Sequence, residues 1–166
     1  MGRPAAADLI RRLDRTVASD GSGLPAGSGT VATGRAIFAN KCASCHGEEG
    51  TGGAAEPLVG GRGSLASATP LKTVGSYWPY ATTLFDYIRR AMPLNAPRSL
   101  ADPEVYGLVA YLLWRNGIVA ADTRLDWKSL PRVRMPNRDG FVSVAPYAYD
   151  GNVERVGSKK LEGDRP

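Results

Sequence analysis

The sequence predicts an all-α domain of three to four short helices, preceded by an irregular arm and followed by a long extension. Residues 102–116 carry the clearest helical pattern, whereas 20 glycines and 12 prolines among 166 residues indicate that much of the other backbone forms turns and loops. Both cysteines and the only histidine lie within five consecutive residues. We therefore expect an N-terminal arm (1–30), a helical domain (31–117) and an extended C-terminal tail (118–166).

The helix at 102–116 has start and stop signals and one apolar face. Asp102 is the expected N-cap, Pro103 the first helical residue and Gly117 the residue just past the end. The aromatic residues Tyr111 and Trp114 flank the apolar face and are interpreted as core, since helical spacing alone accounts for them. The residues of the apolar face are Val105, Leu108, Val109, Leu112 and Leu113.

Three other segments also have helical character. A short helix is expected at 6–17 within the arm, and a core helix begins at Thr33 and leads into the cysteines. Gly34 on the buried side of that helix allows another helix to approach closely, with Phe38 one turn later. A third helix is expected at 82–91, where Pro93 ends it and leaves Met92 in the following loop.

The run Cys42-Ala43-Ser44-Cys45-His46 is a Cys-x-x-Cys-His motif. At this spacing two thiols add to the vinyl groups of a haem while the neighbouring imidazole binds its iron. A closed zinc site needs four N or S ligands, and the sequence offers only three. A thioredoxin-like dithiol would follow a strand, whereas a helix is expected before Cys42. The motif therefore predicts one covalent haem c, with a reactive dithiol as the remaining alternative.

A low-spin haem iron bound by His46 needs a second axial ligand, and the sequence has no second histidine. Met92 emerges from a helix end and is the predicted ligand. Met135 is the competitor, but it lies well beyond the last packed helix. A lysine, a tyrosine or an open site is a further alternative. With His46 and Met92 on the iron, the expected chemistry is outer-sphere transfer of single electrons, so the chain is not expected to be catalytic on its own.

Composition excludes two classes of partner. A formal net charge of +5 without a block of Lys and Arg argues against nucleic-acid binding and is consistent with orientation toward an acidic protein face. No run approaches the about 18 apolar residues of a membrane span, and no export signal is visible. Because bacteria attach haem to this motif outside the cytoplasm, we expect a periplasmic chain whose signal has been removed.

The pattern over about 31–117 resembles class I cytochromes c, namely a helix with Gly34 and Phe38, the Cys-x-x-Cys-His motif, a glycine-rich loop, Met92 and a terminal helix. The resemblance implies the class I cytochrome c fold, with Gly34 and Phe38 packed against Leu108 and Tyr111. It also implies that Pro57 and Leu58 lie beside the haem. The carbonyl of Pro57 would then accept a hydrogen bond from Nδ1–H of His46.

A narrower resemblance is to the cytochrome subunit of sulfane dehydrogenase, carried by residues 20–29, 58–61, 72–80, 90–93 and 135–141. It implies a molybdenum-cofactor dehydrogenase subunit as partner, within a periplasmic thiosulfate-oxidising system, and a cytochrome c as electron acceptor. Some members carry a second haem domain, but this sequence has one motif and can hold one haem. The alternative is a freely diffusing monohaem cytochrome c that serves a respiratory oxidase.

Two groups of residues keep open roles at this stage. Tyr77, Trp78 and Tyr80 could donate hydrogen bonds to the haem propionates or simply pack their loop, and Arg62, Arg89 and Arg90 could lie at the haem edge or be solvated. Apolar residues of the tail are expected to wrap over a catalytic partner, with coverage of the domain's own surface as the alternative. These tail residues are Leu125, Trp127, Leu130, Phe141 and Tyr147.

Overall fold

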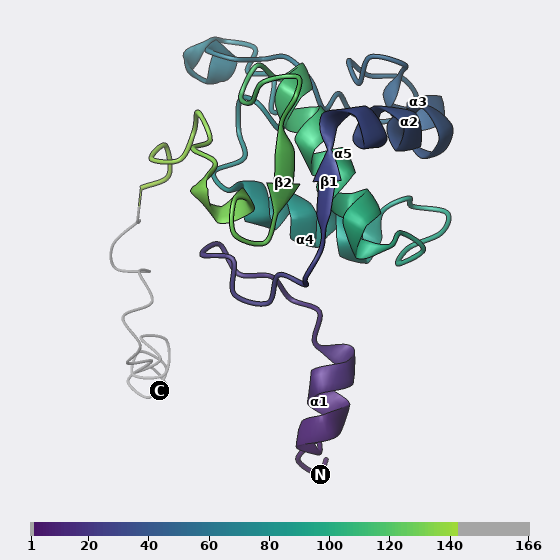
Figure 1. Ribbon diagram of the computed structural model, residues 1–166. Coiled ribbons are helices and arrows are strands. Elements are labelled where there is room, and N and C mark those ends of the chain that lie inside the picture. The colour runs from purple at the N-terminus through teal and green to yellow at the C-terminus, as the bar shows by residue number, and fades with distance from the viewer. Residues whose placement is uncertain (1, 143–166) are drawn as a thin grey trace, which may run out of the picture.

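The computed structural model describes residues 2–142 and confirms a mostly helical domain (Figure 1). No helix among these residues has the length and apolar character needed to cross a bilayer. Short 3₁₀ turns occur at Ser64–Ala66 and Leu130–Arg132. The main elements are α1 (Ala7–Leu13), β1 (Ser28–Thr30), α2 (Val31–Lys41), α3 (Ala43–His46), α4 (Ala81–Ala91), α5 (Asp102–Arg115) and β2 (Arg124–Asp126).

Helix α5 is the centre of the core, and α2 crosses it at very close range. A Cβ atom built on Gly34 of α2 would overlap the backbone of Gly107 in α5. One turn further along, the rings of Phe38 and Tyr111 lie 5.1 Å apart between centroids. The predicted contact of Gly34 and Phe38 with the terminal helix is confirmed, with Gly107 as the residue that lets the two backbones meet.

The start of α5 differs by one residue from the prediction. Ala101, not Asp102, is the N-cap, and the Glu104 carboxylate accepts the N–H of Ala101 at 2.8 Å. Asp102 does not cap the helix because its carboxylate binds the Arg89 guanidinium, with 2.8 Å from Nε to Oδ1. The end agrees with the prediction, since Gly117 follows the last turn with a φ of 66°.

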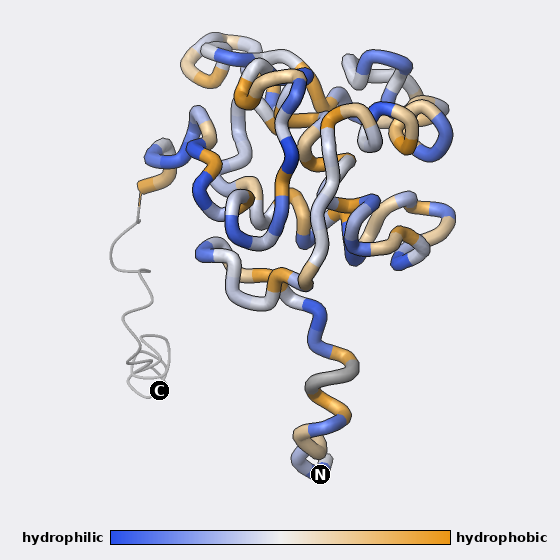
Figure 2. Tube along the Cα trace, in the orientation of Figure 1, coloured by the Kyte–Doolittle hydropathy of each residue, from blue (hydrophilic) through white to orange (hydrophobic). Residues whose placement is uncertain are grey.

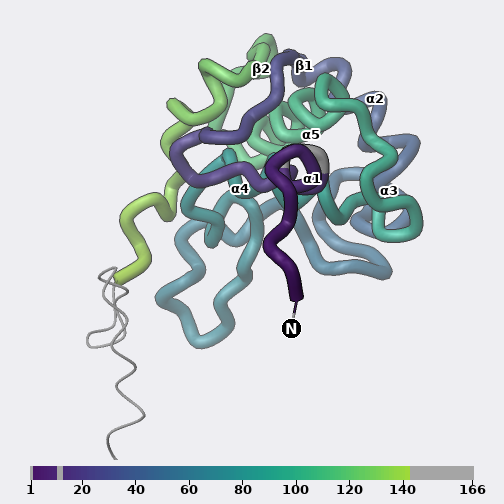
Figure 3. Tube along the Cα trace, turned by 90° about the horizontal axis from the view of Figure 1, so that it is seen from below, coloured from purple at the N-terminus to yellow at the C-terminus, as the bar shows by residue number. Residues whose placement is uncertain are grey.

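The arm and the tail join the body of the domain instead of standing apart. Strands β1 and β2 pair antiparallel beside α5, with Ser28 opposite Asp126 (Figures 1 and 3). Leu125, Leu130 and Met135 are each at most 3% exposed and belong to the same core as α4 and α5. The expectation that Leu125 and Leu130 wrap a partner is therefore wrong, because they cover this domain's own core.

The remaining tail residues are placed differently. Trp127 and Phe141 are about half exposed, and Phe141 packs edge-on against Tyr77 with centroids 5.3 Å apart. Tyr147 lies outside the described residues. The described part of the tail thus contributes both to the core and to the surface.

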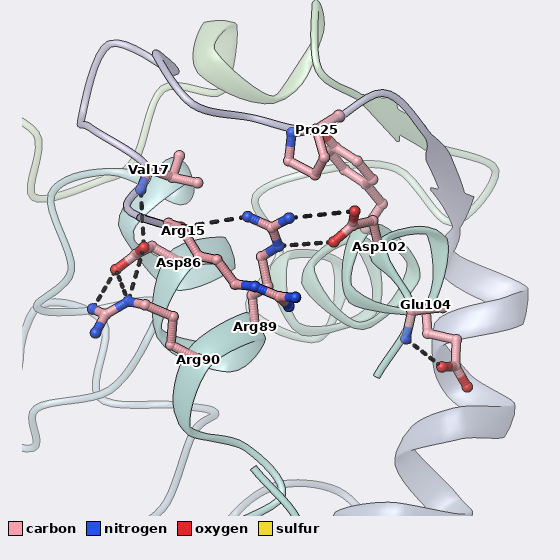
Figure 4. Close-up of polar contacts among 10 residues, drawn as sticks. Arg15, Val17, Pro25, Asp86, Arg89, Arg90, Asp102 and Glu104 are labelled. Carbon is pink, nitrogen blue, oxygen red and sulfur yellow. Dashed lines mark hydrogen bonds and ion pairs between the residues drawn. The ribbon is translucent and has the colours of Figure 1, made fainter. Parts of the chain in front are cut away.

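Hydrogen bonds to α4 and α5 hold the arm after α1 (Figure 4). The N–H of Val17 donates to Asp86 Oδ1 at 2.9 Å, and the hydroxyl of Tyr106 donates to the carbonyl of Pro25 at 2.8 Å. The helix expected at 6–17 ends early, at Leu13, because the Asp14 carboxylate accepts the N–H of Thr16 and turns the chain.

Helix α1 itself extends away from the body, with apolar and polar residues mixed along it (Figure 2). Leu9, Ile10 and Leu13 are exposed on it. Nothing in the core of the domain therefore depends on α1 among the described residues.

Candidate haem site

An apolar cavity of about 500 Å³ lies between the cysteine motif, the end of α4 and one face of α5. Its volume is within the range of about 300–1,000 Å³ that is usual for cofactor sites. Leu108 and Leu112 of α5 line it, as does Leu58 from the glycine-rich loop. The other lining residues are Phe38, Lys41, Cys42, Ser44, Cys45, His46, Ala55, Ile88, Met92, Pro93, Leu94, Asn95 and Leu100.

A single helical turn places the motif residues together. The N–H groups of Cys45 and His46 both donate to the carbonyl of Cys42, at 3.1 and 3.0 Å. Residues three and four positions apart share one face of a helix, so both thiols and the imidazole line the same cavity. Neither cysteine is in a disulfide.

The ring of His46 is fixed by a backbone carbonyl. Its Nδ1 lies 2.9 Å from the carbonyl oxygen of Glu56, which leaves Nε2 as the nitrogen available to a metal. The acceptor expected at Pro57 is thus wrong by one residue. The physical reason is that the Ala55 N–H donates to the carbonyl of Cys45 at 2.8 Å, and this contact brings the Glu56 carbonyl to the ring.

Met92 lies at the end of α4 and lines the cavity. Its N–H donates the last helical bond to the carbonyl of Ile88 at 3.1 Å, and its own backbone is extended, so the chain leaves the helix here. Met135 is 1% exposed and packs in the core, and it does not line the cavity. The structure therefore brings Met92 and His46 to one cavity and keeps Met135 away from it.

The predicted aromatic residues of the loop at 77–80 contact other side chains. Trp78 packs against Tyr87, with centroids 5.8 Å apart, and the Arg138 guanidinium lies 4.5 Å from the centre of the Tyr80 ring. None of these three aromatic residues lines the cavity formed by the described residues 2–142, and Pro57 does not line it either. Their propionate role stays a prediction, while their packing role is visible.

Arg89 and Arg90 are paired with acidic groups instead of lining the cavity. Arg90 Nε lies 3.0 Å from both carboxylate oxygens of Asp86, and Arg89 binds Asp102. Burial raises the pKa of Asp86, but hydrogen bonds from Arg90 and the Val17 N–H, together with the charges of Arg90 and Arg89, lower it below its usual value overall. These pairs anchor the last turns of α4, from which Met92 emerges.

One of the two cysteines, Cys42, is poorly suited to thiol chemistry. Burial raises the pKa of the Cys42 thiol to about 11; Lys41 opposes this rise and Cys45 adds to it. The thiolate is the reactive form of cysteine, and at this pKa it is scarce at neutral pH. The site therefore disfavours Cys42 as the attacking thiol of a dithiol oxidoreductase, whereas Cys45 is exposed.

The residues present fit haem c. Two thiols at attachment spacing, an imidazole with Nε2 available and a thioether line one mostly apolar cavity. The sequence analysis missed Asn116, whose side chain bonds the loop that forms part of this cavity. The only sequence signal for it was its position just before Gly117, which is typical of a helix C-terminus.

The chain matches a family model described as cytochrome C oxidase, cbb3-type, subunit III, over residues 29–112. It is also similar to a solved chain of the sulfane dehydrogenase SoxCD from Paracoccus pantotrophus, at 42% identity and a TM-score of 0.82. That match covers 90% of this chain and 74% of the other.

A curated relative, thiosulfate dehydrogenase of Stutzerimonas stutzeri (strain A1501), is 29% identical over 93 residues. The match covers 53% of this chain and only 28% of the relative. Residues 29–112, which the family model matches, contain α2, the cysteine motif, Met92 and most of α5. The chain belongs to the cytochrome c family that this model represents, and membership implies a covalently bound haem c.

Proposed function

We propose that this chain is a single-haem electron-transfer subunit that accepts electrons from a molybdenum-cofactor dehydrogenase acting on reduced sulfur and passes them to a cytochrome c. One observation carries the proposal: His46 of α3 and Met92 at the end of α4 line the same apolar cavity as the two cysteines. With both axial positions filled by protein, substrate binding at iron is disfavoured and electron transfer is favoured.

The haem, when bound, supplies a one-electron Fe(III)/Fe(II) couple. Cys42 and Cys45 would hold the macrocycle covalently, and His46 and Met92 would bind the metal. Leu58, Leu108 and Leu112 line the cavity with aliphatic carbon. Such a wall limits water at the ring, and a soft thioether favours Fe(II), so both raise the reduction potential.

The proposed partner and location rest on the SoxCD likeness. That protein is named a sulfane dehydrogenase, and the match covers most of this chain, including regions outside α2 and α5. The relatives of this kind support a role in sulfur oxidation. We propose a periplasmic location on the same grounds. We propose one haem per chain because the sequence holds one attachment motif.

Co-purification tests the proposal directly. The native chain, isolated from its source under mild conditions, should bring with it a larger subunit, and metal analysis should find molybdenum and iron in equal amounts. A reduced-minus-oxidised visible spectrum should show the sharp α-band of a low-spin haem c, corresponding to one haem per chain. Isolation of a monomer with iron alone would favour the freely diffusing carrier, and a colourless protein would contradict both.

A truncation separates these two candidates only if it leaves the core of the domain intact. Removing everything from residue 118 would delete Leu125, Leu130 and Met135 from the core and would unfold either kind of protein. Removing residues 143–166 leaves the described core intact. A diffusing carrier should remain a monomer with unchanged electron transfer after this truncation, as should a variant that lacks residues 1–13.

A further inference from the structure

The side chain of Asn116 joins the C-terminus of α5 to the glycine-rich loop. Its Nδ2 donates to the carbonyls of Leu112, at 2.8 Å, and of Leu58, at 3.1 Å. Its Oδ1 accepts the N–H of Gly60 at 3.1 Å. One amide therefore adds a second hydrogen bond to a helix-end carbonyl, which also accepts the Asn116 N–H at 3.2 Å, and it holds the loop at two positions.

A second loop closes over the same place. The Val74 N–H donates to the carbonyl of Leu58 at 3.2 Å, and the Thr73 hydroxyl donates to the carbonyl of Gly60 at 2.6 Å. A Cβ atom at Gly75 would overlap the Asn116 side chain. Asn116 is thus enclosed by the loops at 58–60 and 73–75, and no other residue type of this size offers both a donor pair and an acceptor.

The loop that Asn116 holds at Leu58 and Gly60 also carries the backbone carbonyl that accepts the hydrogen bond of the His46 ring. The N–H groups of Leu58 and Val59 donate to the carbonyl of Gly50, at 2.8 and 3.0 Å, and so close the loop that begins at the motif. Glu56, whose carbonyl lies 2.9 Å from His46 Nδ1, is only two residues before Leu58. Leu58 also lines the cavity.

From this connection we infer that Asn116 is a positioning residue for the His46 ligand. By fixing Leu58 and Gly60 it holds the Glu56 carbonyl at the ring nitrogen, and that hydrogen bond sets the orientation and the donor strength of the imidazole. The inference rests on the proposed haem site. A firm bond to Nδ1–H favours Fe(III), so loosening it raises the reduction potential.

The test compares Asn116→Leu with Asn137→Ala in the holoprotein. Asn137 is a matched control, because its Nδ2 donates to a backbone carbonyl, that of Tyr77, at 2.8 Å, away from the His46 loop. In Asn116→Leu the His46 Nδ1–H, followed by NMR, should exchange with solvent about tenfold faster, as expected for losing one or two hydrogen bonds. The midpoint potential should rise. Asn137→Ala should change neither quantity.

Asn116→Asp is the second variant, to be used where Asn116→Leu fails to mature. It keeps an acceptor for Gly60 but loses both donated bonds, so an intermediate exchange rate and potential are expected. If the Asn116 variants lose stability while the exchange rate and the potential stay at wild-type values, the residue is only structural and the inference is overturned. Failure of the haem proposal would show in the wild-type spectrum, before any variant is compared.

Discussion

The His46 side and the Met92 side of the cavity are held in place by different means. The His46 ring bonds directly to the Glu56 carbonyl, and the loop that bears this carbonyl is fixed by Asn116 and by Gly50. Met92 is held by its own N–H, which donates to the carbonyl of Ile88 one turn earlier in α4. The segment that follows, residues 94–99, is exposed throughout.

The anchoring of Met92 lies upstream of the ligand. The ion pair of Arg89 with Asp102 holds α4 against α5. Asp86, which pairs with Arg90 within α4, also accepts the Val17 N–H and so joins α4 to the arm. Within residues 92–99 the described backbone bonds are local ones, from Ala96 to Pro93 and from Ser99 to Ala96. Of the two proposed ligands, His46 is fixed through its own ring and Met92 only through its helix, so the Met92 side should open first.

Substitution of the two proposed ligands, His46 and Met92, should give the largest effects, and these effects should differ between the two sides. His46→Ala should prevent formation of a low-spin holoprotein. Met92→Ala should keep the haem but lose the weak Fe–S absorption at the red end of the oxidised spectrum. Its potential should fall by on the order of 0.1 V, part of the roughly 0.8 V that axial ligands span. Potentiometry and visible spectra measure both.

Met135→Ala is the control for Met92→Ala. It should keep the Fe–S absorption, because Met135 is in the core and not in the cavity, while costing about 2–5 kcal/mol of unfolding free energy. The comparison of the two sides would be contradicted by loss of the absorption in Met135→Ala and its survival in Met92→Ala.

Leu125→Ala should destabilise the core that supports both the His46 side and the Met92 side of the cavity, to the same extent on each. Leu125 of β2 is 3% exposed in the core shared with α5, so its truncation should cost about 2–4 kcal/mol in denaturant unfolding. The spectrum of the folded protein should not change. Trp127→Ala, at a residue 49% exposed, should cost within about 0.5 kcal/mol; equal effects of the two variants would mean that β2 is not part of the core.

Asp86→Asn should loosen only the Met92 side. Hydrogen bonds to a charged group contribute about 1.5–3 kcal/mol, and Asp86 accepts them from Arg90 and from Val17. Because the pKa of Asp86 is lowered in the folded state from 3.8, its contribution is present above pH 3.8 and is lost as pH falls through the folded pKa. The stability difference between wild type and variant should therefore be largest at neutral pH and shrink in acid.

Denaturant titrations followed at the Fe–S absorption and by far-UV circular dichroism measure this effect. The absorption should disappear before the helices unfold, and the gap between the two transitions should widen in Asp86→Asn. Coincident transitions in both proteins would show that the Met92 side opens only with the whole domain.

Pro57→Ala should have little effect on the haem site. The acceptor for His46 is the Glu56 carbonyl, so the ring N–H signal and the potential should stay unchanged. Loss of a proline that restricts the unfolded chain should cost about 0.4–1 kcal/mol. A large change in potential would show that Pro57 acts on the ligand after all.

Periodicity in the sequence was enough to predict the three helices that form the cavity. Helices α2, α4 and α5 have apolar residues at helical spacing, and their ends agree with the predicted ends within about two residues. The presence of the motif and Met92 in one cavity was predictable because few other side chains of the chain can bind iron, and the ligand role of Met92 stays a prediction. The fold class followed from these same segments.

Features that depend on backbone groups could not be predicted in the same way. The acceptor of His46 is a carbonyl, a group that every residue carries, so the sequence gives no signal that distinguishes Glu56 from Pro57. Strands β1 and β2 are three residues each and pair across most of the chain, so neither shows a period. Asn116 gains its role from two loops that meet only in the folded protein.

The pairing of β1 with β2 bears on the order in which the domain is completed. Chains are made from the N-terminus, so Ser28 is present long before Asp126. Until β2 and Leu130 have been synthesised, one side of α5 stays exposed to water and to other incompletely folded chains. If haem is attached at the proposed positions Cys42 and Cys45 before this step, a newly made chain would carry its haem while this side of α5 is still uncovered.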